Sequence, residues 1–226
     1  QPFQNTIFKK SKEINNSIRT VGYVHSFPVG LPSNLIFRDG SPEEIIVNGD
    51  DQYACFTNHL DWSSSRLKIL PSTRFVKKKS ENMSGFIYLP IDINSVSKII
   101  ESLENFIVNN NGKFISNLVV RNHPFKKNSK KHLQAIKSIN TLLAKYNNFF
   151  SNKSDMNIVS IFIGGSGSII EALERGVEVI HICEDPVFQS YSSALWPSIK
   201  VTEVNDNIFK YQLLKKGNLI KFGDND

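Results

Sequence analysis

The spacing of hydrophobic and polar positions changes repeatedly along the chain, and it becomes regular after residue 40. Short apolar runs of strand length alternate there with segments in which apolar residues recur every three or four positions, as in an amphipathic helix. Strands alternating with helices are typical of an α/β sheet. The pattern therefore predicts an α/β fold with a doubly wound, mainly parallel sheet.

The predicted strands are short. They cover Thr20–Ser26, Glu44–Val47, Leu67–Leu70, Phe86–Leu89, Leu118–Arg121, Ile158–Ile163, Val177–Cys183 and a last weak strand at Ile199–Thr202. The run Ile158–Ile163 is apolar throughout, as expected where helices cover both faces of a parallel sheet.

Five helices are predicted beside these strands. They cover Asp51–Leu60, a helix from an N-cap at Asp92 or Asn94 to Asn109–Gly112, a helix capped by Ser129 that buries Leu133, Ile136 and Leu143, the short Ile169–Arg175, and a terminal helix at Asp206–Lys216. Each prediction rests on spacing and capping residues.

The first 40 residues follow no such pattern. Residues 1–20 are polar and Asn-rich, and Phe27–Gly40 is rich in Pro and Gly, which predicts a long loop. Long loops inside a compact domain are often functional or interdomain. We therefore expect residues 1–40 to be a lead-in with an interdomain crossover, and residues 41–226 to be the domain. The chain begins with Gln1 instead of Met, which suggests a piece of something longer.

Composition narrows the class of protein. The chain has 226 residues, 40% of them hydrophobic, with two cysteines. These values exclude a disordered tail, a collagen-like repeat and a disulfide-stapled miniprotein. Two cysteines in such a chain favour a reduced, cytoplasmic protein. No apolar run approaches the ~20 residues that a membrane helix needs.

The net charge of +6 raises the question of an anionic partner. The lysines stand in short clusters such as Lys126-Lys127 and Lys130-Lys131, without the interleaved aromatic motif of RNA-binding domains. A solvated face or an acidic ligand explains them as well as nucleic acid does. We expect no nucleic-acid partner.

The strongest chemical signal is the strand–turn–helix unit from Ile158 to Gly176. Its turn reads Gly164-Gly165-Ser166-Gly167-Ser168. Unpaired N–H groups at a helix start attract phosphate, glycines let it approach the backbone, and serine hydroxyls can donate to it. The alternative is an ordinary turn in which Ser168 and Glu171 form a capping box. The turn matches neither a Walker loop nor a complete dinucleotide fingerprint.

A second signal, Arg121-Asn122-His123-Pro124, follows a predicted strand. Ligands in open α/β sheets bind beyond the carboxyl ends of the strands. Arg121 can fork onto a phosphate, His123 can hydrogen-bond to it, and Pro124 fixes the turn. A lone His beside a Pro is more often only a loop residue, so the motif gains weight from its pairing with the glycine turn.

His25, at the end of the first predicted strand, is a candidate catalytic acid or base; a half-buried structural histidine is the alternative. The other histidines and the cysteines lack metal-ligand spacing, so we expect no metal and no cofactor.

Four segments in order resemble the nucleotide-sugar-binding half of bacterial GT-B glycosyltransferases. They are G-Y-x-H-S (Gly22–Ser26), P-x-x-I-x-V-N-G (Pro42–Gly49), R-x-H-P (Arg121–Pro124) and G-G-S-G-S-x-x-E-A-L (Gly164–Leu173). The narrower resemblance is to surface-carbohydrate transferases that use CMP-Kdo or CMP-sialic acid. It covers the chain from about Val21 to the C-terminus and implies a Rossmann-like domain.

The resemblance also implies roles for individual residues. His123 would contact the donor phosphate or the cytosine, while Ser166, Ser168 and the backbone around them would hold the phosphate. Glu171 would contact the ribose. The implied partners are a nucleotide sugar, with CMP favoured, a glycan acceptor and a missing N-terminal domain of the same enzyme. A peripheral contact with the inner membrane is a further expectation.

Alternatives to this function remain. The paired serine motif of sialyltransferases is Ser-Gly-Ser here, so a UDP-sugar transferase or an epimerase-like enzyme also fits. The same motifs occur in polymerases that use CDP-glycerol. A non-catalytic module that recognises glycans is a third reading.

Overall fold

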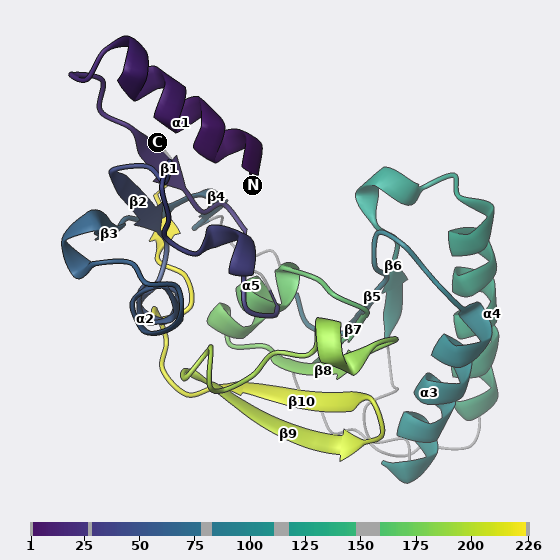
Figure 1. Cartoon of the computed structure of the whole chain (residues 1–226). Coiled ribbons are helices and arrows are strands. Elements are labelled where there is room, and N and C mark those ends of the chain that lie inside the picture. The colour runs from purple at the N-terminus through teal and green to yellow at the C-terminus, as the bar shows by residue number, and fades with distance from the viewer. Residues whose placement is uncertain (1, 27–28, 78–82, 111–117, 148–158, 225–226) are drawn as a thin grey trace.

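The computed structural model describes residues 2–26, 29–77, 83–110, 118–147 and 159–224, and the side chains from residue 5 onward. Ile158, the Phe27-Pro28 pair and the Asn111-Gly112 pair, on which parts of the expected elements fall, lie outside the described residues. The chain forms two lobes around separate sheets (Figure 1).

The N-terminal lobe is built on a small parallel sheet. Its strands β1 (Val21–Tyr23), β2 (Glu44–Val47) and β3 (Leu67–Ile69) lie in that order, with Val21 opposite Glu44 and Ile45 opposite Leu67. Its helical segments are α1 (Pro2–Ile14), η1 (Ser33–Leu35), α2 (Asp50–His59) and η2 (Ser64–Arg66). The expected domain boundary at residue 40 falls inside this sheet.

The C-terminal lobe contains a six-stranded sheet in the order β6-β5-β7-β8-β10-β9. Four strands are parallel, namely β5 (Phe86–Tyr88), β6 (Val119–Arg121), β7 (Val159–Ile163) and β8 (Glu178–Ile182). The other two, β9 (Ile199–Asn205) and β10 (Ile208–Leu213), form an antiparallel hairpin added to β8.

Helices cover both faces of this sheet. One face carries α3 (Val96–Asn109) and α4 (Lys130–Asn147), which pack on the sheet through residues such as Leu103 and Ile139. The other carries α5 (Ser168–Glu174), whose Ile169 and Leu173 pack with Phe162. Short helical segments η3 (Pro124–Lys126) and α6 (Pro186–Gln189) follow β6 and β8. The predicted mixed α/β class with a mainly parallel sheet is confirmed.

One prediction at the chain ends is wrong, and one helix was not predicted. Residues 2–14, expected only as part of a lead-in, form the helix α1. The expected terminal helix at Asp206–Lys216 is instead strand β10, because Asn207 adopts a positive φ of 63° and turns the chain back along β9. Cross-strand pairing on both sides of β10 overrides the local propensity.

Two smaller predictions about the helices also need correction. The N-cap of α3 is Ser95, whose side chain accepts from the Lys98 N–H, instead of Asp92 or Asn94. Leu133 in α4 is 52% exposed, since α4 buries the face that carries His132 and Ala135.

The two lobes are tied by the C-terminal tail, which returns to the N-terminal lobe. Its strand β11 (Phe222–Gly223) pairs with β4 (Ser72–Val76), a strand that the sequence pattern did not predict. On the way it passes the carboxylate of Glu174, which is 1% exposed and accepts three backbone N–H groups. These come from Gly217 at 2.7 Å, Leu219 at 2.7 Å and Ile220 at 3.1 Å.

A second buried carboxylate supports the same junction. Asp51 at the start of α2 accepts from both the N–H and the hydroxyl of Ser198, each at 2.8 Å, and its own N–H donates to the Asn218 carbonyl at 3.1 Å. Burial raises the pKa of Asp51. The helix α2 is thereby fastened to the chain that enters β9.

Among the described residues, none of the helices is both long enough and apolar enough to cross a membrane.

Replacing Glu174 by Ala leaves three buried N–H groups without an acceptor, each costing about 1–3 kcal/mol. We expect the free energy of unfolding, measured in urea, to fall by about 3 kcal/mol or more. The matched control is Glu101→Ala, at an exposed position of α3. Equal stability of the two variants would show that Glu174 does not hold the tail.

Candidate functional site

The four parallel strands end at one edge of the six-stranded sheet. Tyr88 lies opposite both Arg121 and Phe162, and Ile163 lies opposite Ile182. The segments that follow β5, β6, β7 and β8 therefore leave the sheet side by side. This carboxyl edge is where ligands bind in open α/β sheets.

The turn after β7 requires glycine at its first position. Gly164 has a φ of 65°, and a Cβ there would lie 3.1 Å from the Cβ of Pro90 in the segment after β5. Its N–H donates to the Ile182 carbonyl at 2.8 Å. Conformation and packing together account for this residue.

The next two glycines of the turn are different. A Cβ at Gly167 would meet nothing within 4 Å, and one at Gly165 would touch only the side chain of Gln189, at 3.7 Å. Gly167 has ordinary helical angles, φ −65° and ψ −16°. Neither residue needs to be glycine for the fold, so the space above them is open to a ligand.

Several backbone N–H donors around these glycines are unpaired in the described part of the chain. Within the described part of the chain, the N–H groups of Gly165, Ser166 and Gly167 reach no protein acceptor. The Ser166 hydroxyl accepts from the Ser168 N–H at 3.3 Å, so its own proton remains to donate. Donors accumulate at one point, as an anion-binding turn requires.

The capping box that competed for Ser168 and Glu171 does not form. Gly167 is the N-cap of α5 and makes no side-chain cap. Glu171 instead pairs with Arg175, whose Nε and Nη2 both donate to Oε1, at 3.1 and 2.8 Å. The second carboxylate oxygen, Oε2, takes no part in these two bonds.

The buried His181, which was not predicted as a site residue, supports the turn by a hydrogen bond to its first residue. Nε2 of His181 in β8 lies 2.7 Å from the Gly164 carbonyl, and its Nδ1 lies 3.1 Å from the Tyr211 hydroxyl. That hydroxyl also accepts from the Tyr191 N–H at 3.1 Å. Burial lowers the pKa of His181 to about 4, so the ring is neutral at pH 7 and donates from Nε2 to the carbonyl.

His132, also absent from the predicted site, holds the neighbouring segment. Its Nε2 lies 2.9 Å from the Pro90 carbonyl, and its Nδ1 lies 3.1 Å from the Ser129 hydroxyl. Pro90 is the residue that faces Gly164, so this imidazole at the start of α4 fixes the second wall of the turn. Its only sequence signal was a histidine on the apolar face of a helix.

The Arg121–Pro124 segment lies two strands away from the glycine turn. His123 is half-buried and caps η3, since its Nδ1 accepts from the Phe125 N–H at 3.4 Å. Pro124 is the first residue of η3 and fixes this turn. Burial, with His132 and Lys126 nearby, lowers the pKa of His123. A neutral ring that accepts at Nδ1 carries its proton on Nε2.

Arg121 does not follow its neighbours beyond the strand end. Its guanidinium lies 3.6 Å from the ring centre of Phe86 and 5.9 Å from that of Tyr88. Phe86 precedes Tyr88 in β5, so the guanidinium lies back over the face of the sheet. The structure thus brings His123 to the carboxyl edge and leaves Arg121 stacked on an aromatic ring.

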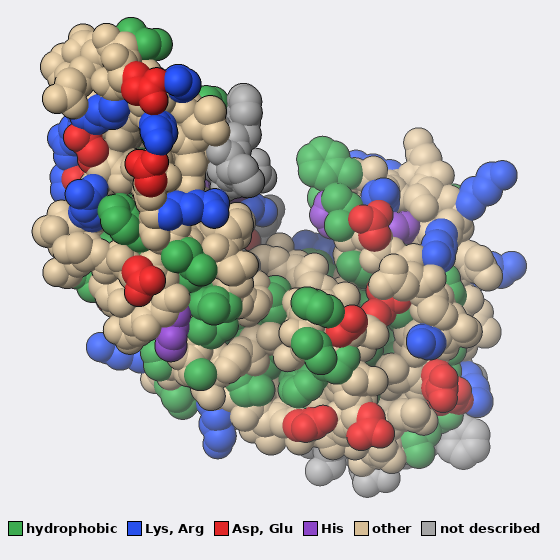
Figure 2. Space-filling view, in the orientation of Figure 1, with side chains coloured by type: hydrophobic (Ala, Val, Ile, Leu, Met, Phe, Trp, Pro, Cys, Tyr) green, Lys and Arg blue, Asp and Glu red, His purple; other side chains and the backbone are tan. Residues whose placement is uncertain are grey.

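His25 belongs to the N-terminal lobe. It is exposed after β1, and its carbonyl accepts from Arg74 at 3.5 Å. It borders a cavity of about 390 Å³ whose wall includes Phe8, Ile45 and Trp62. Figure 2 shows the molecule hollowed between this lobe and the region of β6.

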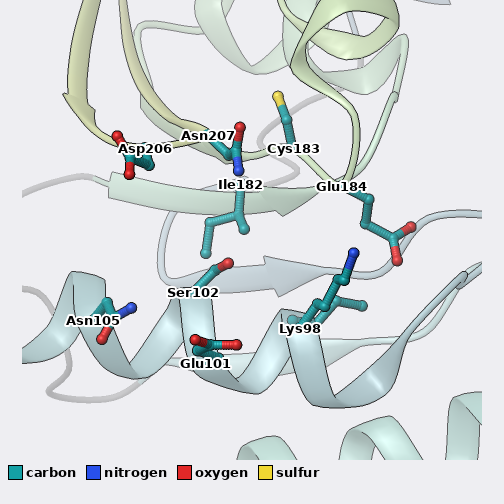
Figure 3. A pocket seen from close by; sticks show the side chains of 10 residues that line it. Lys98, Glu101, Ser102, Asn105, Ile182, Cys183, Glu184, Asp206 and Asn207 are labelled. Carbon is teal, nitrogen blue, oxygen red and sulfur yellow. The ribbon is translucent and has the colours of Figure 1, made fainter.

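A second cavity, of about 300 Å³, lies between α3 and the turn that joins β9 to β10 (Figure 3). Lys98, Glu101 and Glu184 line it. Glu184 is already used, since it accepts from the N–H groups of Asn94 and Ser95 at the start of α3, both at 3.0 Å. None of the predicted site residues borders this cavity.

Over the described ranges, no cluster of three or more His, Cys, Asp or Glu side chains is arranged to hold a metal ion.

Comparison of the chain with protein-family models, with curated proteins and with solved structures gave no significant match.

The support that His181 gives the turn makes stability depend on pH. A neutral imidazole with a pKa of about 4 in the folded state binds fewer protons than the unfolded chain, whose histidine titrates near 6.5. Stability contributed by the neutral ring is therefore present above pH 6.5 and lost as the pH falls toward 4. The full difference amounts to about 3 kcal/mol.

We expect urea unfolding curves of the native chain and of His181→Gln to converge as the pH falls from 7 to 4.5. A difference in stability that is constant over this range would contradict the assignment.

The glycines of the turn can be separated by stability alone. Gly164→Ala should cost about 2 kcal/mol, because its left-handed φ and the contact with Pro90 both oppose a Cβ. Gly167→Ala should leave the free energy of unfolding unchanged or slightly raised, since its angles suit any residue. Equal losses in thermal unfolding would show that Gly167 is also structural.

Proposed function

We propose that the C-terminal lobe binds the phosphate of a nucleotide sugar at the Gly164–Ser168 turn. On this proposal the protein is a GT-B glycosyltransferase that moves an acidic sugar, of the ulosonic or sialic type, from a CMP-linked donor to a glycan acceptor. Its Rossmann-like domain would be the six-stranded lobe, and surface polysaccharide synthesis would be its pathway.

The observation that carries the proposal is the pair of glycines without a structural reason. A Cβ at Gly165 or Gly167 would clash with nothing, and the N–H groups around them reach no protein acceptor in the described chain. Side chains at these positions would cover those donors. A phosphate group fits because it accepts several N–H bonds at once and tolerates no bulk between itself and the backbone.

His123 supplies a second contact at a suitable separation. It leaves the sheet from β6, while the turn leaves from β7, with β5 between them. Two interstrand spacings amount to about 10 Å. That separation is comparable to the length of a nucleoside monophosphate, so one molecule can reach from the turn to His123. The protonated Nε2 would donate to the phosphate or to the base.

The same groups would assist the chemical step. When the glycosidic bond to the nucleotide breaks, negative charge grows on the departing phosphate. The N–H groups of the turn and the hydroxyls of Ser166 and Ser168 would stabilise that charge. Glu171 Oε2, which Arg175 leaves unused, would accept from a ribose hydroxyl.

The N-terminal lobe would serve the acceptor. His25 is exposed on the N-terminal lobe, after β1, and would take the proton of the attacking hydroxyl. The strand β1 is at the edge of its sheet, with Val21 and Tyr23 exposed. Further strands of an acceptor domain would pair there.

Calorimetric titration with CMP, CDP and UDP tests the proposal. We expect CMP to bind most tightly, and Ser166→Ala and His123→Ala each to weaken it at least tenfold, since each removes a hydrogen bond to a charged group. Matched controls are Ser193→Ala and His59→Ala, both at exposed positions. A preference for UDP would move the assignment to a UDP-sugar enzyme.

If none of the three nucleotides binds below millimolar concentration, the proposal is wrong, and a non-catalytic module becomes the better reading. If CMP binds but the site variants and the controls bind it equally well, the turn is not the phosphate site.

A further inference from the structure

The turn after β6 carries a large apolar side chain into solvent. Phe125 is 87% exposed, although Pro124 and the His123 cap hold the surrounding 3-10 turn in a defined shape. Its only ring contact among the described residues is with His123, at 5.7 Å between centres. A rigid turn that projects an aromatic ring away from the protein suits a partner outside it.

The segment that carries this ring is rich in positively charged residues. Residues 121–131 contain Arg121 and four lysines but no carboxylate, and the lysines are Lys126, Lys127, Lys130 and Lys131. Lys126 is held 3.0 Å from Asp92, and the Lys131 ammonium donates to the Asn94 carbonyl at 2.8 Å. Lys127 and Lys130 are exposed, with no acidic partner within the described chain.

A second exposed aromatic shows that exposure alone is not the signal. Phe188 in α6 is 75% exposed but follows Glu184 and Asp185, and residues 184–190 contain no cation. Phe125 therefore differs from Phe188 in the charge of the neighbouring residues and not in its exposure. Figure 2 shows hydrophobic side chains at the rim of the hollow, over the region of β6, with histidine, acidic and cationic side chains beside them.

We infer that Phe125 with Lys126, Lys127, Lys130 and Lys131 forms a docking surface for an anionic phospholipid membrane. Exposed lysines are attracted to the negative potential of such a surface, and a phenylalanine side chain can insert at the boundary between headgroups and acyl chains. The charge of this surface complements the membrane, and the exposed ring supplies the insertion that a solvated cluster of lysines lacks.

Docking here has a geometric consequence. The same turn carries His123 and borders the hollow, so the membrane would lie at the mouth of the candidate site. This inference does not depend on the proposed nucleotide specificity, because the surface would bind lipid whatever the site binds.

Sedimentation of the whole chain with vesicles tests the inference. We expect binding to vesicles of 30% phosphatidylglycerol in phosphatidylcholine at about 0.05 M salt, and at least tenfold weaker binding to pure phosphatidylcholine. Raising the salt to about 0.3 M should weaken the binding, because screening acts on exposed charges. No binding to the anionic vesicles, or equal binding to both kinds, would overturn the inference.

Variants locate the surface. Phe125→Ser and the double variant Lys127→Glu with Lys130→Glu should each weaken vesicle binding about tenfold or more, since reversal removes two attractions. Phe188→Ser and Lys98→Glu are the matched controls and should bind as the native chain does. If the two controls lost as much vesicle binding as the Phe125 and lysine variants, the assignment to this surface would be overturned.

A fluorescent variant reports on the ring itself. The native tryptophans Trp62 and Trp196 are buried, at 4% and 2% exposed, so Phe125→Trp adds an exposed reporter. Its emission should shift to shorter wavelength on anionic vesicles. Binding of Phe125→Trp to the vesicles without this shift would show that the ring does not enter the lipid. A 20-nucleotide RNA that binds more tightly than the vesicles, and that the same variants weaken, would show that the surface does not bind lipid.

Discussion

The carboxylate of Glu174 is the interaction on which the arrangement of both lobes depends. It ends α5 inside the protein and accepts N–H groups from Gly217, Leu219 and Ile220, which lie in a segment without regular structure. Buried backbone of this kind needs partners, and a charged acceptor is a strong one. Because it fixes the path of the tail, β11 arrives beside β4 and the N-terminal lobe is held against the larger one.

At the carboxyl edge of the large sheet, buried side chains also hold the backbone of irregular segments through hydrogen bonds. Two imidazoles, His181 and His132, bond to the carbonyls of Gly164 and Pro90, which face each other across the first bend of the turn. Each ring takes its second bond from a hydroxyl, so both are fully used. The carbonyls of Gly164 and Pro90 are held by the two imidazoles, while the positions of Gly165 and Gly167 are open to solvent. Preorganised anion binding requires such a fixed backbone with accessible donors.

The core of the fold could be predicted from the sequence, because its signals are local. Runs such as Val159–Ile163 and the three-to-four spacing after Ser95 follow from burial on one or both faces, and the strands and helices predicted between residues 44 and 183 appear near their expected positions. The elements that were missed depend on distant partners. Strand β4 is defined by β11, and β10 by β8 and β9. The helix α1 is polar, and ion pairs such as Lys12 with Glu43 hold it.

The candidate site shows the same division. The glycine–serine turn and the His123-Pro124 pair could be found because glycine, serine and proline act on their own backbone. The orientation of Arg121 could not, since the ring of Phe86 in the neighbouring strand determines it. The supporting role of His181 also depends on a pairing across the sheet, with Gly164 in the next strand's turn.

The pairing of β11 with β4 also constrains the order in which the chain can fold. The Ser72 N–H donates to the Lys221 carbonyl, and the Lys77 side chain meets that of Asp224, 147 residues later. Closing so long a loop is slow and is favourable only after the intervening sheet has formed. On the ribosome, β4 would therefore remain an unpaired edge until β11 had emerged, and a chaperone that shields exposed strand edges would be most useful during that interval.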